Sequence, residues 1–160
     1  MPTFKSDYAT GVKNTPVPGG AELMVCRASL TFASGSDVAA NDLLQMMDLP
    51  ANCVPVDLIL DTDDFDSSTT GTVSVNLGND TLSGGVYTAA TDIAANPWLT
   101  TQSIQAATGV RADAAGLRAM SRVTPDATRA RPVFIKIVGE TTPPATERTI
   151  GLTLFYRAAA

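Results

Sequence analysis

Histidine is missing from this chain of 160 residues. Its absence removes the commonest general base, the usual histidine-dependent catalytic groups, and zinc or iron sites with imidazole ligands. The chain also has no CxxC pair and no GxSxG motif. The glycine-rich stretch LGNDTLSGG lacks the lysine of a phosphate-binding loop. We therefore expect a protein that is not an enzyme, with no hydrolase activity, no catalytic residues and no cofactor.

Charged residues are scarce, at 17% of the chain against about 25% in a usual soluble domain. The formal net charge is −5, and the basic residues are scattered. Nucleic acid is not an expected partner, because phosphate binding needs clustered lysine and arginine. A looser group of arginines from Arg111 to Arg131 could face an acidic partner, although scattered, solvated arginines are the simpler interpretation.

Long apolar runs are absent as well. No stretch approaches the roughly 18 consecutive apolar residues that a membrane helix requires, so no membrane partner is expected. The two cysteines, Cys26 and Cys53, lie in apolar segments, and no secretory leader pattern opens the chain. We expect buried, reduced, slowly reacting thiols in preference to a Cys26–Cys53 disulfide.

Two regions differ in composition. Residues 1–20 are polar, spaced by proline and glycine, and end in the turn signal PVPGG. They predict an extended N-terminal arm that adds little to a core and takes its order from a neighbouring subunit. Residues 21–160 predict a single domain, because the length suits one core and no linker composition interrupts it. Deleting residues 2–18 is then expected to leave the fold intact.

Apolar and polar residues alternate over several segments bounded by turn residues, which predicts about eight strands. The apolar residues that share one face of a strand are Met24, Cys26, Ala28, Leu30 and Phe32; Val54, Val56, Leu58 and Leu60; Val73, Val75 and Leu77; Val133, Ile135 and Ile137; and Ile150, Leu152, Leu154 and Tyr156. Asp57 and Asp61 are predicted to point outward. Strands at this spacing predict an all-β protein, an antiparallel β-sandwich or a barrel.

The segment RADAAGLRAMSR, residues 111–122, is ambiguous. Its alanine content favours a helix, but Gly116 would cost about 1 kcal/mol in a helix interior. We therefore predict a turn followed by a strand from Leu117 to Val123.

Four aspartates, Asp61, Asp63, Asp64 and Asp66, stand within six residues between two predicted strands. An EF-hand loop fails in both registers, because the required glycine and glutamate are missing. A glycosidase pair would need an aromatic-lined cleft, and only 6% of the chain is aromatic. A solvated turn is favoured, since Asp and Ser satisfy local backbone groups and block edge pairing. Asp63, Asp64 and Asp66 remain weak candidates for a looser calcium site.

The segment ANDLLQMMDLPANCVPVDLILDTDDFDSSTTGTVSVNLGN, Ala40 to Asn79, resembles the small capsid decoration (cement) proteins of tailed bacteriophages. The shared pattern is a Leu49–Pro50 turn, a strand from Val54 to Leu60, an Asp/Ser run from Asp63 to Ser68, and a strand from Thr72 to Gly78. The closing IKIVG…IGLTLFYRA is also similar. The likeness covers about Glu22 to the C-terminus, although LPAN lacks the glycine that often follows Leu-Pro-Ala and the middle of the chain is long.

The resemblance implies a jelly-roll-like sandwich that binds the outer face of a phage head as a dimer or trimer and stabilises neighbouring major capsid subunits. It implies a virion location on the capsid surface, with synthesis in the host bacterial cytoplasm. Two alternatives stay open: a calcium-dependent carbohydrate- or receptor-binding sandwich, and another virion component of the tail or head–tail region.

Overall fold

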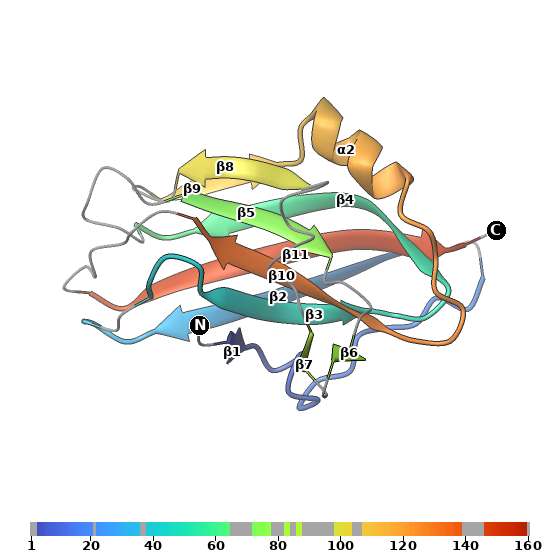
Figure 1. The fold of residues 1–160 in the computed structure, drawn as a ribbon, viewed down its shortest axis with the longest axis horizontal. Helices are drawn as coiled ribbons and strands as arrows, with labels where there is room; N and C mark the ends of the chain where they lie inside the picture. The colour runs from blue at the N-terminus through green and yellow to red at the C-terminus, as the bar shows by residue number, and fades with distance from the viewer. Residues whose placement is uncertain are drawn as a thin grey trace.

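Two β-sheets packed face to face form the molecule, seen in the computed structural model in Figure 1. The structure describes residues 3–20, 22–35, 38–64, 72–77, 82–83, 86–87, 98–103, 107–138 and 146–159. The strands are β1 (Thr3–Lys5), β2 (Leu23–Phe32), β3 (Leu43–Leu49), β4 (Cys53–Thr62), β5 (Thr72–Leu77), β6 (Leu82–Ser83), β7 (Val86–Tyr87), β8 (Leu99–Ser103), β9 (Thr108–Arg111), β10 (Arg131–Ile137) and β11 (Arg148–Ala158). Within these ranges there is one helix, α2 (Ala114–Ser121), which lies beside β4 at an edge of the sandwich.

The strand order is that of a jelly roll. The five-stranded sheet runs β1-β3-β10-β5-β8 and the four-stranded sheet runs β2-β11-β4-β9, while β6 and β7 pair separately. Numbered in chain order from β2 and without the β6–β7 pair, the eight main strands give the orders 1-8-3-6 and 2-7-4-5. Every described pairing is antiparallel except the parallel pair β1–β3. The predicted all-β, jelly-roll-like sandwich of about eight strands is confirmed.

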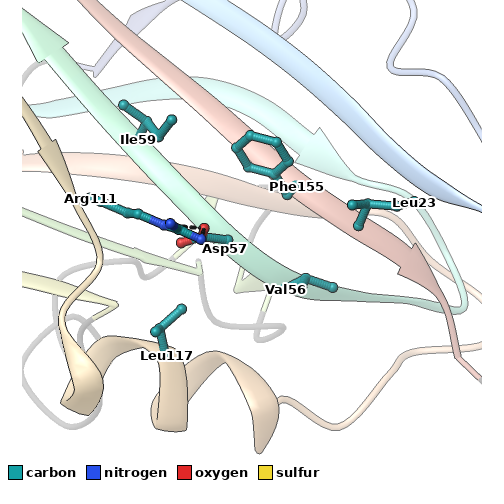
Figure 2. Close-up of a pocket in the computed structure, with 7 residues that line it drawn as sticks. All are labelled: Leu23, Val56, Asp57, Ile59, Arg111, Leu117 and Phe155. Atoms are coloured by element: carbon teal, nitrogen blue, oxygen red, sulfur yellow. Dashed lines mark hydrogen bonds and ion pairs between the residues drawn. The ribbon is translucent and has the colours of Figure 1, made fainter.

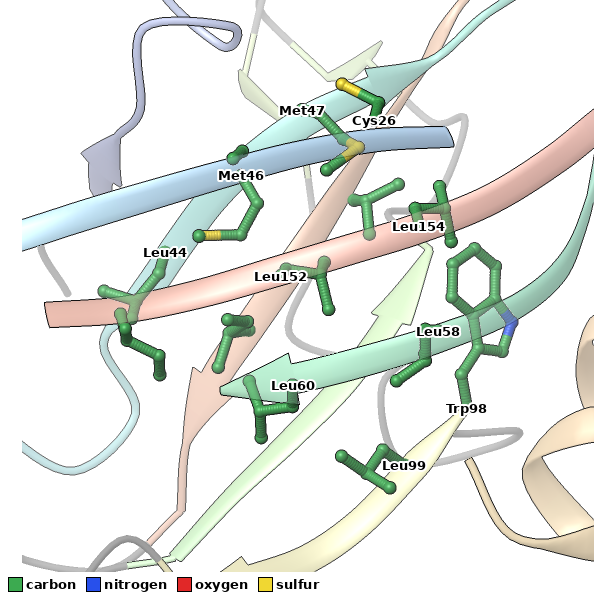
Figure 3. Close-up of a cluster of buried hydrophobic side chains, with 14 of the residues drawn as sticks. Cys26, Leu44, Met46, Met47, Leu58, Leu60, Trp98, Leu99, Leu152 and Leu154 are labelled. Carbon is green, nitrogen blue, oxygen red and sulfur yellow. The ribbon is translucent and has the colours of Figure 1, made fainter. Parts of the chain in front are cut away.

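The core lies between the sheets and is built from the alternating residues (Figure 3). All four residues predicted for the last strand, Ile150, Leu152, Leu154 and Tyr156, are fully buried. The predicted faces of β2 and β10 are confirmed too, with Met24 and Leu30 at the margin of the core. Val73, Val75 and Leu77 stand opposite Ile137, Ile135 and Val133 in the β5–β10 ladder, and the side chains of β5 are outside the described part of the structure.

The prediction for β4 is wrong in its first half, because a β-bulge shifts the alternation. Phe155 pairs with Asp57 and Tyr156 pairs with Pro55, so Val56 is an extra residue in β4. A one-residue shift sends side chains to the opposite face of a sheet. Pro55 is buried, Val54 is only half-buried and Val56 is 39% exposed on the outer face. Proline suits this position, since a bulge tolerates a residue without an N–H donor.

The predicted strand from Leu117 to Val123 is also wrong, since residues 114–121 form α2. The carboxylate of Asp113 caps the helix by accepting a hydrogen bond from Gly116 N at 2.8 Å. A Cβ atom at Gly116 would lie 1.9 Å from the carbonyl oxygen of the buried Trp98. The glycine that disfavours a helix in isolation is therefore what lets this helix lie against the backbone at Trp98.

The N-terminal segment is held by its own domain. β1 pairs with β3, and the Ser6 hydroxyl donates a hydrogen bond to the carbonyl oxygen of Met46. The Phe4 ring meets Phe32 edge to face, with centroids 5.2 Å apart. Further along, the Tyr156 hydroxyl donates to the carbonyl oxygen of Pro16. The expectation that a neighbouring subunit orders this segment is therefore wrong for these residues.

Both thiols are free and buried. Cys26 on β2 stands opposite Leu154, and Cys53 on β4 stands opposite Ala158, with β11 between them. Two strand spacings and four residues along the strand separate their Cα atoms by about 16 Å, too far for a disulfide. Burial raises the pKa of both thiols, which agrees with the expected slow reactivity.

Candidate interaction face

The outer face of the four-stranded sheet carries apolar side chains that the fold leaves uncovered. On β2, Leu23 is 57% and Val25 49% exposed, and on β4, Val56 is 39% and Ile59 36% exposed. Phe155 of β11 stands between these strands, opposite Val25 on one side and Asp57 on the other. We call this surface, with its polar groups described below, the outer face.

A groove of about 340 Å³ runs along the outer face beside α2 (Figure 2). Four strands and the helix contribute its lining residues, which are Leu23, Val56, Asp57, Ile59, Arg111, Leu117 and Phe155. The bulge in β4 turns Val56 toward this groove, and α2 brings the partly exposed Leu117 to its other side. Gly116 contributes indirectly to the groove, because its close approach to the backbone at Trp98 helps to place the helix that carries Leu117.

An ion pair lies within this apolar surface. Arg111 contacts one carboxylate oxygen of Asp57 through both Nε and Nη2, and the other oxygen accepts a hydrogen bond from Leu58 N at 2.9 Å. The Asp57 side chain is only 8% exposed, while that of Arg111 is 70% exposed. The hydrogen bond and the charge of Asp57 raise the pKa of Arg111. The sheet therefore presents the guanidinium and hides the carboxylate.

A second ion pair crosses β11. Arg27 of β2 reaches Asp61 of β4 over Gly151, which lies between the two strands. A Cβ atom at Gly151 would come within 2.7 Å of both charged groups, so the missing side chain leaves room for the pair to cross β11. Asp61 points outward as predicted, and its carboxylate forms an ion pair with an arginine that lies far away in the sequence.

The remaining predicted acidic candidates are only partly placed. Asp63 pairs with the backbone of Thr149, accepting from its N–H at 2.6 Å and donating its own N–H to the carbonyl at 2.9 Å. Asp64 is exposed, and Asp66 lies outside the described residues. Within the described ranges, no group of three or more Cys, Asp or Glu side chains is arranged to hold a metal ion. A backbone partner on β11, which is 86 residues away in the sequence, therefore accounts for the Asp63 side chain.

A second, larger hollow of about 710 Å³ lies under the N-terminal segment. Tyr8, Lys13 and Val17 line one side of it, with Asp48 and Pro50 on the other. Burial raises the pKa of Asp48. The Lys13 ammonium lies 5.9 Å from the centre of the Tyr8 ring and 3.2 Å from the carboxylate of Asp7. Both of these contacts of Lys13 are therefore within the N-terminal segment.

The chemistry of the outer face suits recognition of a protein surface. Apolar side chains around a guanidinium resemble the centre of a protein–protein interface, where aromatic residues and arginine are enriched. None of the groove residues is a cysteine, serine or lysine that could act as a nucleophile. In the described part of the chain, no helix is long and apolar enough to cross a bilayer.

Sequence reasoning missed the groove. The outward positions of β2, β4 and β11 carry Leu23, Val25, Ile59 and Phe155, where a solvated sheet face would carry polar residues. In these strands apolar residues occur at outward as well as inward positions, and this pattern could have indicated an apolar outer face. The position of Leu117 had no such signal, because its segment was predicted to be a strand.

Comparison with known proteins gives results at the level of structure. No family model matches the chain, and no curated protein matches it. The chain is similar to a chain in the capsid of Ralstonia phage GP4, with 28% identity, a TM-score of 0.75 and coverage of 99% of both chains. It also shares its fold with a chain in the capsid asymmetric unit of cyanophage Pam1, with 16% identity, a TM-score of 0.53, and coverage of 92% of this chain and 95% of that one. These likenesses support a structural protein of a phage virion related to capsid proteins.

Proposed function

We propose that this chain is a capsid decoration protein, which binds the outer surface of a phage head and stabilises neighbouring major capsid subunits. The observation that carries the proposal is the likeness to a phage capsid chain over 99% of both chains, at 28% identity. The whole fold is therefore shared with a capsid component, and not only one motif within it.

The architecture supports an accessory role in the capsid. The chain has its own hydrophobic core between two sheets, and its N-terminal segment closes onto that core. A unit that completes its own fold can be added to a finished shell without unfolding. It needs one adhesive surface for this, and the outer face offers apolar groups at such a surface. We propose that the chain acts without catalysis, as a homodimer or homotrimer that multiplies modest contacts with the shell.

The direct test adds the purified chain to heads assembled without it. We expect saturable binding in a sedimentation assay, together with a higher melting temperature of the heads. Sedimentation equilibrium of the chain alone reads the oligomeric state, with a dimer or trimer expected. Absence of binding to the heads would contradict the proposal, and so would calcium-dependent binding to a glycan array in its place.

A further inference from the structure

We infer that the outer face of the four-stranded sheet is the surface by which this chain docks on an acidic region of the phage shell. The inference rests on the proposed function and adds to it the docking surface and the chemistry of the partner surface. Four observations carry it: exposed apolar side chains, a groove, an ion pair that presents its cation, and an excess of arginine.

The apolar component is continuous across three strands. Val25 of β2 stands opposite Phe155 of β11. On β4, Val56 and Ile59 lie on either side of Asp57, which stands opposite Phe155. Exposed apolar groups that cluster in this way mark interaction sites, whereas single exposed residues do not. The groove between the sheet and α2 gives such a cluster a concave centre into which a partner side chain fits.

The charges of the outer face select the partner. Arg27, Arg111 and Arg157 all extend from it, Arg157 being opposite Leu23 in the ladder. Of its carboxylates, Asp57 is buried beneath Arg111 and Asp61 is held by Arg27. The chain carries a net charge of −5, yet this face carries three arginines against two aspartates. Complementary potential therefore favours a partner surface with exposed carboxylates.

Arg111 is suited to receive such a carboxylate. Its Nε and Nη2 contact Asp57, and among the described residues Nη1 has no hydrogen-bond partner. Asp57 fixes the guanidinium in place, so little side-chain freedom is lost when a second carboxylate binds. Arginine surrounded by apolar groups is the usual composition of an energetic centre in a protein interface.

The same charges disfavour a second copy of this chain as the occupant. A two-fold contact through the outer face would bring together two identical surfaces that each have an excess of arginine over aspartate. Like charges brought together at an interface cost binding energy. An oligomer of this chain is therefore expected to use another surface, leaving the outer face for the shell.

The test compares matched substitutions on the full chain. Val25→Asp and Val56→Asp alter the outer face, and Val138→Asp is the control, because Val138 is 46% exposed against 49% for Val25. Arg157→Gln removes an exposed charge at the end of β11 without touching the core, and Lys13→Gln is its control. Melting curves and sedimentation equilibrium establish that each variant is folded and keeps the oligomeric state of the wild type.

Binding is measured to heads assembled without the chain. We expect each outer-face aspartate to weaken binding by about tenfold or more and the controls by less than about twofold, as for central and peripheral interface residues. The binding of the wild-type chain should weaken as the salt concentration rises. The binding of Arg157→Gln should depend less steeply on the salt concentration. If the wild type binds and the folded outer-face variants bind equally well, the docking surface is wrong and the proposed function stands.

Two further outcomes would also overturn the inference. Dissociation of an oligomer by Val25→Asp or Val56→Asp would make the outer face a contact between copies of this chain. Failure of the wild-type chain to bind heads would overturn the proposed function itself, and the docking surface with it.

Discussion

The two sheets of the sandwich differ in how far the apolar side chains on their outer sides are exposed to solvent. In the five-stranded sheet, Leu43 and Phe134 are buried although they do not belong to the central core, with exposed fractions of 3% and 2%. In the four-stranded sheet, the corresponding outward residues Leu23 and Val25 are 57% and 49% exposed. Apolar side chains occupy the outer side of both sheets, and only one of these sides is covered.

This difference distinguishes apolar residues that stabilise the fold from apolar residues that are available to bind a partner. Strands buried on both sides have nearly continuous apolar sequences, as in LLQMMDL of β3 and PVFIKI within β10. Their burial is complete within one chain and contributes to the stability of that chain. The outer face instead keeps its apolar surface accessible, at a cost in solubility that a free-standing domain would avoid. A partner that covers it explains why these residues are present.

The sharpest test of the comparison uses one phenylalanine from each sheet. Phe134→Ala, on the covered side, should lower the free energy of unfolding by about 3–5 kcal/mol, because it empties a buried site. Phe155→Ala, on the half-buried outer face, should cost clearly less. Urea unfolding of both variants measures the difference. Equal losses would mean that the outer face of the four-stranded sheet contributes to folding as much as its counterpart does.

The second test concerns the edge of the five-stranded sheet. Deleting residues 2–18 removes β1 and the contacts of Phe4 and Tyr8 with the core, so we now expect a loss of about 2–4 kcal/mol. Hydrogen exchange should increase most in β3, which loses its neighbour. A truncated chain that unfolds at the same urea concentration as the full one would restore the original expectation of an arm without a role in the fold.

The third test acts on the wall of the groove. Gly116→Ala should cost about 1–3 kcal/mol, since the new methyl group meets the backbone at Trp98. Gly109→Ala on β9 is the control, because no atom lies within 4 Å of the added Cβ and no loss is expected. Thermal unfolding of the two variants gives the comparison. A neutral Gly116→Ala would mean that α2 can move away from the backbone at Trp98 without cost.

Sequence pattern predicted the parts of the fold that depend on local alternation. In β2, β10 and β11 the core residues stand at every second position, as the sequence pattern predicted. β4 departed from prediction because the bulge at Val56 depends on its partner strand. α2 was missed because the contact that requires Gly116 is with Trp98, in a separate element. The roles of Phe4 and Ser6 likewise depend on residues far along the chain.

The candidate site was less predictable than the fold. The arginine group was noticed, but nothing in the sequence indicated that Arg111 would cover Asp57 or that Arg27 would cross Gly151 to reach Asp61. The first pair forms because β9 lies beside β4, and the second forms because β11 lies between β2 and β4. The aspartate cluster attracted attention because it is compact in sequence, whereas the outer face is compact only in space.

Electron cryo-microscopy of heads decorated with this chain tests the central claim most directly. The account predicts jelly-roll density on the outside of the shell, with the outer face of the four-stranded sheet turned toward the capsid subunits and carboxylates of those subunits near Arg111. Density in which the outer face points to solvent would contradict the docking surface. Density in which this chain itself builds the continuous shell would contradict the decoration role.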